Sequence, residues 1–324
     1  MISSPVEWRD MKKEKSDKKS SDHSTTAYHV PVLLHEAIEG LNIQGEGVYV
    51  DCTFGGGGHS REILKHLGPN GKLVAFDQDA DARQNLPGDD RIVFVPHNFR
   101  HLQRFLRLNK IGSVNGILAD LGVSSHQFDE AERGFSTRFK GELDLRMDQR
   151  QDVHAYDVLN TYTEQQLHKL FEQYGEVTNS KTLARTVVAA RKNISLKTIS
   201  NFKEAVGAVV KGNPNKYFAQ VFQALRIEVN DELGALKDML LQSADVLKTG
   251  GRIAIITFHS LEDRIVKNFF KKGGFEPEET TNPFAQTIPS PFKLVNKKPL
   301  QPGPEEIKNN PRSRSARLRI AEKI

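Results

Sequence analysis

The sequence predicts an α/β fold, a mainly parallel sheet covered by helices, with an all-helical subdomain inserted into it. Short apolar runs alternate with helical patterns along residues 47–120 and again along 227–258, as is typical of βαβ units. The chain between residues 120 and 252 is far longer than one crossover helix needs. Its central part, 157–210, is helical in pattern and poor in strand patterns, which indicates a separate helical unit.

The individual strands and helices are predicted from local patterns. A helical pattern at 60–67 follows the first apolar run, and a turn rich in glycine and proline ends it. Leucines at helical spacing predict a helix over 227–248, with Gly250 and Gly251 as its end. The apolar runs that predict buried strands lie at 47–52, 73–77, 91–95, 115–120 and 252–258.

Further patterns set the domain organisation. Thr163 followed by Gln166 predicts a helix start, because a Thr N-cap and a Gln three residues later form a capping box. Strand-like stretches at 292–297 and 316–321 predict an antiparallel hairpin at the sheet edge. We therefore predict a disordered tail at 1–24, a sheet domain in two parts at 25–132 and 222–324, and an inserted helical domain at 133–221.

The composition excludes several classes of protein. The 324 residues include 46 Lys and Arg, 41 Asp and Glu and one Cys, with a formal net charge of +5. One Cys excludes a disulfide framework and a Cys-based zinc finger. No apolar run reaches the roughly 18 residues of a membrane span. The charged N-terminus matches neither a signal peptide nor a transit peptide, so we expect a cytoplasmic protein without membrane association.

Basic residues cluster at 91–110, 181–203 and 291–324, and the first two stretches contain no acidic residue. Such stretches attract phosphates and favour RNA as the partner. For any single stretch, a solvated helix face is the alternative. The candidate phosphate contacts are Arg185, Arg191, Arg312 and Arg314.

A glycine cluster, Gly55 to Gly58, follows the first predicted strand and precedes a helix. Glycines let the backbone approach a ligand closely, and the helix that follows directs N–H groups at that ligand. The spacing fails the G-x-G-x-x-G dinucleotide pattern, because the third glycine position holds Ser60 or Arg61. A ligand with a carboxylate and a sulfonium therefore fits better than a pyrophosphate. A tight strand-to-helix turn without a ligand is the alternative.

Asp77 ends the second predicted strand, 22 residues after Gly55. A carboxylate at this place can accept hydrogen bonds from both hydroxyls of an adenosine ribose. An exposed loop aspartate is the alternative. Asp77 and Asp79 without a further ligand cluster do not indicate coordination, so we expect no metal.

Two more motifs follow predicted strands. Asp120 opens the loop after the fourth strand, where a turn cap is its alternative role. His259 is expected at the carboxyl end of the fifth strand, beside the same crevice. Ser260 and Asp263 fit a capping box. A hydrolase triad is excluded, because Ser260 lies in no G-x-S-x-G elbow and residues on one turn cannot take the triad geometry.

Seven motifs together indicate a family. Over about residues 28–323 the chain resembles the bacterial small-subunit ribosomal RNA methyltransferase H family. The resemblance implies a Rossmann-like class I methyltransferase domain with an inserted helical domain. It also implies methylation of N4 of a cytosine, cytosine 1402, in 16S rRNA with S-adenosyl-L-methionine. The motifs are HVPVLL at 29–34, TFGGGGHS at 53–60, DLGVSS at 120–125, ERGFS at 132–136, LDLRMD at 143–148, FHSLEDR at 258–264 and NPRSRS at 310–315.

The resemblance implies the cofactor residues, whereas the chemistry of N4 methylation leads to the hypotheses for Asp120 and His259. Asp120 is the predicted acceptor for an N4–H, with Ser124, Ser125 or a backbone carbonyl as alternatives, and His259 is predicted to line the base pocket. Arg133 and Arg146 either contact RNA or pair with a nearby acid, Glu142, Asp144 or Asp148. The implied cofactor residues are Gly57, Gly58, His59, Asp77, Phe99, Asp120 and Gln127.

The partner implied is 16S rRNA, alone or in the small ribosomal subunit. Because duplex RNA hides the base edges, we expect an unpaired or easily opened cytosine that leaves its stack. A methyltransferase that acts on another RNA or on a small molecule is the alternative, and a catalytically silent RNA-binding protein is a further one. The oligomeric state stays open, with a homodimer among the alternatives.

Overall fold

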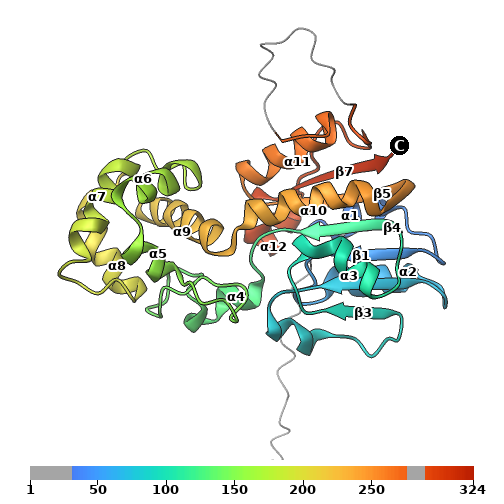
Figure 1. Cartoon of the computed structure of the whole chain (residues 1–324), viewed down its shortest axis with the longest axis horizontal. Coiled ribbons are helices and arrows are strands. Elements are labelled where there is room, and N and C mark those ends of the chain that lie inside the picture. Colours follow the sequence, from blue (N-terminus) through green and yellow to red (C-terminus); the bar gives the residue numbers. More distant parts are fainter. Residues whose placement is uncertain (1–30, 276–288) are drawn as a thin grey trace, which may run out of the picture.

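The structure is a computed structural model that describes residues 31–275 and 289–324 (Figure 1). The tail predicted at 1–24 and the first two residues of the motif at 29–34 lie outside these residues. Among the helices in the described ranges, none combines the length and the apolar character that a bilayer span requires.

The predicted α/β fold is confirmed. Within the described residues, a seven-stranded sheet has the order β3-β2-β1-β4-β5-β7-β6. Strands β1 to β5 run parallel, whereas β7 is antiparallel to both β5 and β6, as the predicted terminal hairpin requires. The strands are β1 Val48–Asp51, β2 Lys72–Phe76, β3 Ile92–Val95, β4 Val114–Asp120, β5 Leu247–Thr257, β6 Phe292–Leu294 and β7 Arg317–Lys323.

Helices cover both faces of the sheet. Successive strand residues point to opposite faces, so Ile117 packs on one side of β4 and Leu118 on the other. Helices α3 Leu102–Leu108, α10 Glu232–Val246 and α11 Ser260–Lys272 bury apolar residues on the Ile117 side. Helices α1 Leu34–Leu41 and α2 Gly58–His66 do so on the Leu118 side. This three-layer arrangement leaves the carboxyl ends of the parallel strands open to a ligand.

A second group of helices forms a lobe beside the sheet (Figure 1). The lobe has its own apolar core, which runs from Phe135 to Leu225 along the chain. The Thr163 hydroxyl and the Gln166 side chain cap α6 as predicted. The predicted boundary between residues 221 and 222 falls inside α9. The helices are α5 Ala155–Thr161, α6 Glu164–Gln173, α7 Ser180–Ala190, α8 Ile199–Val206 and α9 Pro214–Asn230.

The single helix predicted over 227–248 is wrong. The structure has two helices there, because Asp231 adopts a left-handed conformation with φ +45° between α9 and α10. The leucine spacing continues after the break, which is why periodicity alone does not reveal it. Helix α10 also ends at Val246, and Gly250 and Gly251 lie within β5 rather than at a helix end. The break directs α9 away from the sheet and into the lobe (Figure 1).

Candidate functional site

A cavity of about 960 Å³ lies at the carboxyl ends of the parallel strands. Its wall at the sheet includes Asp77 after β2, Asp120 at the end of β4 and Phe258 after β5, and its far wall includes Phe222 and Arg226 of α9. We call these two parts the sheet end and the lobe end. The cavity thus lies where α/β sheets bind ligands and extends to the inserted lobe. Of the predicted cofactor residues, Gly58, His59, Asp77, Phe99, Asp120 and Gln127 line it.

The glycine turn brings bare backbone to the sheet end. Gly57 has φ +73° and lies just behind the lining residues, and a Cβ at Gly57 would lie 2.8 Å from the ring of Phe54. Gly58 begins α2, and a Cβ there would lie 2.1 Å from Cγ of Pro31. The helix starts two residues before the predicted 60, and its first residues, Gly58 and His59, line the cavity.

Asp77 is bonded directly to the glycine turn. Its Oδ2 accepts a hydrogen bond from the N–H of Gly55 at 2.7 Å, and its Oδ1 accepts one from the N–H of Asp79 at 2.8 Å. Each carboxylate oxygen keeps one further acceptor position. Burial raises the pKa of Asp77 to about 7, and the two backbone hydrogen bonds oppose that rise. The sheet end thus holds an acceptor pair of the kind that a ribose diol needs.

A buried ion pair stabilises the loop after β2. Nη2 of Arg133 lies 2.8 Å from Oδ2 of Asp79, with both side chains almost fully buried. Nε2 of Gln127 donates to the same oxygen at 2.7 Å. Nη2 of Arg133 also lies within hydrogen-bond distance of the carbonyls of Arg146 and Met147. Arg133 thus links the start of the inserted segment to the loop that carries Asp77.

Both Arg133 and Arg146 form ion pairs, and their contact with RNA stays untested. Arg133 pairs with Asp79 and Asp81, not with the acids considered from the sequence, whereas Arg146 does pair with Asp144 at 2.7 Å. Arg133 and Asp79 are distant in the sequence. Their opposite charges allow an ion pair, but no local pattern predicts that the two residues meet. The side-chain amide of Gln127 donates to Asp79 through Nε2, and its Oε1 accepts from the N–H of Ser124 in the capping box of α4 Ser125–Asp129. Gln127 also lines the cavity.

Asp120 ends β4 with an unpartnered oxygen. Oδ1 of Asp120 is buried and makes no hydrogen bond among the described residues. Oδ2 lies 3.8 Å from Nδ1 of His59, but this contact is not an ion pair, because burial lowers the pKa of His59 to about 4. Nε2 of the neutral His59 ring lies 3.1 Å from the carbonyl of Val32. Burial, and then the charges of Asp51 and Glu262, raise the pKa of Asp120 well above its usual value.

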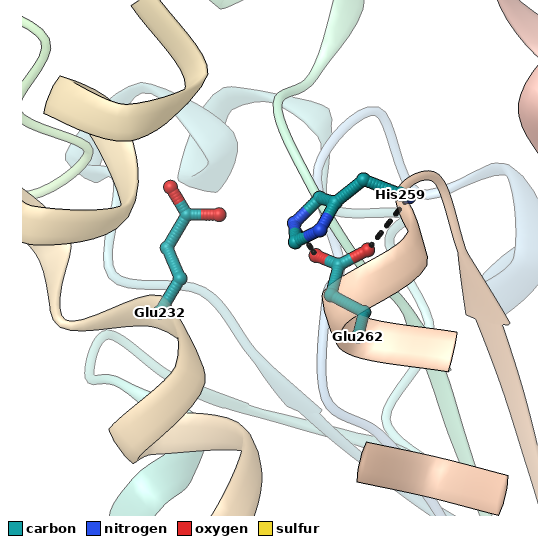
Figure 2. Close-up of side chains that lie close together, drawn as sticks. All are labelled: Glu232, His259 and Glu262. Atoms are coloured by element: carbon teal, nitrogen blue, oxygen red, sulfur yellow. Dashed lines mark hydrogen bonds and ion pairs between the residues drawn. The ribbon is translucent and has the colours of Figure 1, made fainter. Parts of the chain in front are cut away.

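His259 does not line the cavity, although its neighbours Phe258 and Glu262 do. Its imidazole lies between the carboxylates of Glu262 and Glu232 (Figure 2). The base-pocket role of His259 stays a prediction, and its side chain lies behind the wall rather than on it.

The capping box predicted from Ser260 and Asp263 is wrong. The N-cap residue is His259, and Oε2 of Glu262 accepts hydrogen bonds from the N–H groups of Phe258 and His259 at 2.9 and 3.4 Å. The helix starts one residue earlier than the Ser-x-x-Asp spacing indicates. Asp263 is instead held by Arg319, with Nε 2.6 Å from its Oδ1.

The four predicted RNA-binding arginines lie in different surroundings. Arg185 is exposed on α7 of the lobe, and Arg314 is exposed near β7. Arg191 donates to the carbonyls of Leu159 and Tyr162, so its guanidinium stabilises the lobe. Arg312 lines the cavity and lies over the ring of Phe128 at 5.2 Å. Of the four, Arg312 is therefore best placed beside a ligand in the cavity.

The strand order, the glycine turn after β1 and the acid after β2 define an S-adenosyl-L-methionine-dependent methyltransferase of class I. Residues 26–324 match the model of the MraW methylase family. The chain belongs to this family.

Curated relatives cover almost the whole chain. A protein of Parabacteroides distasonis named "Ribosomal RNA small subunit methyltransferase H" is 53% identical over 94% of this chain and 100% of its own length. A protein of the same name from Flavobacterium johnsoniae is 54% identical over 93% of this chain and 99% of its own length. Among solved structures, an rRNA methylase from Streptococcus thermophilus aligns with a TM-score of 0.40 and 12% identity, over 91% of this chain and 99% of that one. This last likeness adds nothing to the family match.

We expect the affinity for S-adenosyl-L-methionine to weaken as the pH falls through about 7, where Asp77 takes up a proton. We expect the ionised carboxylate to accept from both ribose hydroxyls, whereas the protonated form would lose one of these acceptor oxygens. If only the ionised form binds, Kd rises by up to about tenfold for each pH unit below the pKa. Calorimetry on both sides of pH 7 measures this slope. In Asp77→Asn, binding is expected to be weak and much less dependent on pH, so an unchanged slope in that variant would exclude Asp77 as its cause.

Proposed function

We propose that this chain transfers a methyl group from S-adenosyl-L-methionine to the exocyclic N4 amine of a cytosine, cytosine 1402, in the 16S rRNA of the small ribosomal subunit. The observation that carries the proposal is the side chain of Asp120, which lines the cavity together with Asp77 and the glycine turn and whose Oδ1 makes no hydrogen bond among the described residues. The names of the relatives support the small-subunit rRNA as substrate.

The residues at the sheet end fit the cofactor. The turn at Gly57 and Gly58 packs without side chains against Phe54 and Pro31, and each carboxylate oxygen of Asp77 keeps a further acceptor position. We infer that Asp77 holds the ribose and that the N–H groups at the start of α2 face the carboxylate of the amino acid part. Bound there, S-adenosyl-L-methionine supplies an electrophilic methyl group on a sulfonium.

Asp120 is the proposed acceptor for an N4–H of the cytosine. The N4 lone pair is delocalised into the ring, so the amine needs orientation more than a strong base. A hydrogen bond to an oxygen of Asp120 would turn N4 toward the methyl group and draw its lone pair out of conjugation. Such positioning contributes up to roughly 7–11 kcal/mol in favourable cases. Of the alternatives, Ser124 is the less available, because its hydroxyl caps α4.

The lobe end is the proposed place of the target nucleotide. The cavity is lined by Asp120, by Phe258 and by Phe222 of α9, so an extruded base would meet aromatic side chains within it. Arg312 over Phe128 offers a positive charge at the same wall for a flanking phosphate. This arrangement favours a nucleotide over a small metabolite.

Arg312→Ala is expected to weaken RNA binding and to make it less dependent on salt. Removal of one phosphate-binding charge lowers the slope of log K against log salt by roughly 0.7 for single-stranded RNA. Lys271→Ala, which removes one exposed charge at the end of α11, is the matched control and should leave the slope unchanged. Filter binding at several salt concentrations measures both. Equal slopes in the two variants would exclude Arg312 as a phosphate contact.

Mass mapping of small-subunit rRNA from cells that lack this protein tests the proposed function. We expect one cytosine to lose a methyl group on N4 and to regain it when the purified protein and S-adenosyl-L-methionine are added to small subunits. A methyl group missing from another RNA, or transfer only to a free metabolite, would assign the enzyme a different substrate. The cytoplasmic location and the homodimer stay predictions.

A further inference from the structure

Three ligand-type side chains meet at the wall of the cavity (Figure 2). Glu232 is the first residue of α10, His259 is the N-cap of α11, and Glu262 lies in the first turn of α11. One ligand atom from each residue lies within 4.8 Å of the other two. The side chains are 10%, 8% and 3% exposed, respectively. Along the chain only Glu262 is near His259, whereas Glu232 lies far from both, so the fold brings the three side chains together.

The imidazole of His259 is buried, and its Nε2 contacts the carboxylate of Glu262. Within the described part of the chain, both ring nitrogens are buried without a hydrogen bond of acceptable geometry. Nε2 does lie 3.1 Å from Oε1 of Glu262. That separation suits two atoms that bind one ion side by side, because ligands about 2.0–2.2 Å from an ion lie roughly 3 Å apart. Buried polar groups are rarely left unsatisfied, so the ring indicates an additional ligand.

The charges around the ring also favour a cation. Arg226 donates to both oxygens of Glu232, with Nε–Oε1 at 2.7 Å and Nη2–Oε2 at 3.0 Å. Two carboxylates against one guanidinium leave one net negative charge beside the imidazole. Each oxygen of Glu232 keeps a second acceptor position, so the arginine and an ion can share the carboxylate.

We propose that Glu232, His259 and Glu262 bind one divalent transition-metal ion, of which Zn²⁺ and Mn²⁺ are the examples to test. An imidazole with two carboxylates suits these ions better than Mg²⁺ or Ca²⁺, which prefer oxygen ligands alone. Because Glu232 and Glu262 also line the cavity, the ion has a path from solvent. The proposal goes beyond methyl transfer and does not depend on it.

The ion would join two parts of the fold. Glu232 follows the break at Asp231, where the chain returns from the lobe, and His259 and Glu262 follow β5. An ion bound to all three would fix the junction between lobe and sheet. Since it binds the folded chain, it should also raise the melting temperature.

Titration of the chelator-treated full-length protein with Zn²⁺, and separately with Mn²⁺, tests the site. We expect one ion per chain, a higher melting temperature, and an affinity at least about tenfold weaker in His259→Ala and in the closer mimic His259→Gln. His168→Ala is the matched control, because His168 also lies near a glutamate, with Nε2 3.8 Å from Oε1 of Glu172, but on the outside of α6. This control should bind like the wild type.

A crystal soaked with Mn²⁺ should show its anomalous signal between the three side chains. Equal affinity in the His259 variants, a signal elsewhere, or no binding at millimolar ion would overturn the proposal. So would an imidazolium at His259 that bridges the two carboxylates at neutral pH, seen by NMR with no ion bound. None of these readouts uses methyl transfer, so failure of the metal site and failure of the proposed function are separable.

Discussion

Asp120→Asn is expected to lower the rate of methyl transfer by about 10²-fold or more, while the affinity for S-adenosyl-L-methionine stays nearly unchanged. The substitution keeps the shape of the side chain but replaces one acceptor oxygen by an NH₂ group, which repels an incoming N4–H. Within residues 31–275 and 289–324, Oδ1 of Asp120 makes no hydrogen bond, so the change disturbs few other contacts. Single-turnover methylation of small subunits, with calorimetry of cofactor binding, separates the two quantities.

A loss of folding would not account for the expected fall in the methyl-transfer rate of Asp120→Asn. The raised pKa of Asp120, caused first by burial, means that the folded chain holds the proton more tightly than the unfolded chain. Stability is therefore lost as the pH rises from the unfolded pKa toward the folded pKa. Asparagine cannot ionise, so the variant should melt no lower than the wild type at neutral pH. Asp245→Asn, at an exposed position of α10, is the control and should keep full activity. A full rate in Asp120→Asn would rule out its acceptor role.

Arg133→Ala is expected to lower the free energy of unfolding by about 3–5 kcal/mol, the usual cost of breaking a buried pair. It leaves the carboxylate of Asp79 buried, with Gln127 as its remaining side-chain donor at Oδ2. Because the N–H of Asp79 donates to Asp77, we also expect weaker cofactor binding. Urea unfolding and calorimetry measure the two effects.

A double-mutant cycle shows whether the Arg133–Asp79 pair is the cause. Asp79→Asn removes the buried charge, so Arg133→Ala should cost less in that background than in the wild type. Arg312→Ala breaks the more exposed pair with Asp129 and is the control, with an expected change in stability of about 0–1 kcal/mol. Additive effects of the Arg133 and Asp79 substitutions would show that the pair does not stabilise the loop.

Much of the sheet end could be predicted from the sequence. The apolar runs mark the strands, because buried parallel strands are apolar on both faces. The carboxyl ends of parallel strands meet at one edge, so the positions of Gly58, Asp77 and Asp120 follow from their places after strands. The glycine spacing also excludes the dinucleotide pattern from local information alone.

Contacts between distant segments could not be predicted. The Arg133–Asp79 pair and the Glu232–His259–Glu262 group depend on how the lobe meets the sheet, which local patterns do not encode. The break at Asp231 could not be predicted from the apolar pattern, because α9 and α10 both carry apolar residues at helical spacing. At α11, two acids follow the strand, and only the backbone shows that Glu262 rather than Asp263 completes the cap.

A crystal structure with S-adenosyl-L-methionine bound tests the central claim most directly. We expect its ribose hydroxyls on the carboxylate of Asp77, its amino acid part at the glycine turn, and its methyl group directed toward Asp120. A donor molecule bound elsewhere on the chain, or one that leaves Asp77 without a contact, would contradict the assignment of the sheet end as the methyl-donor site.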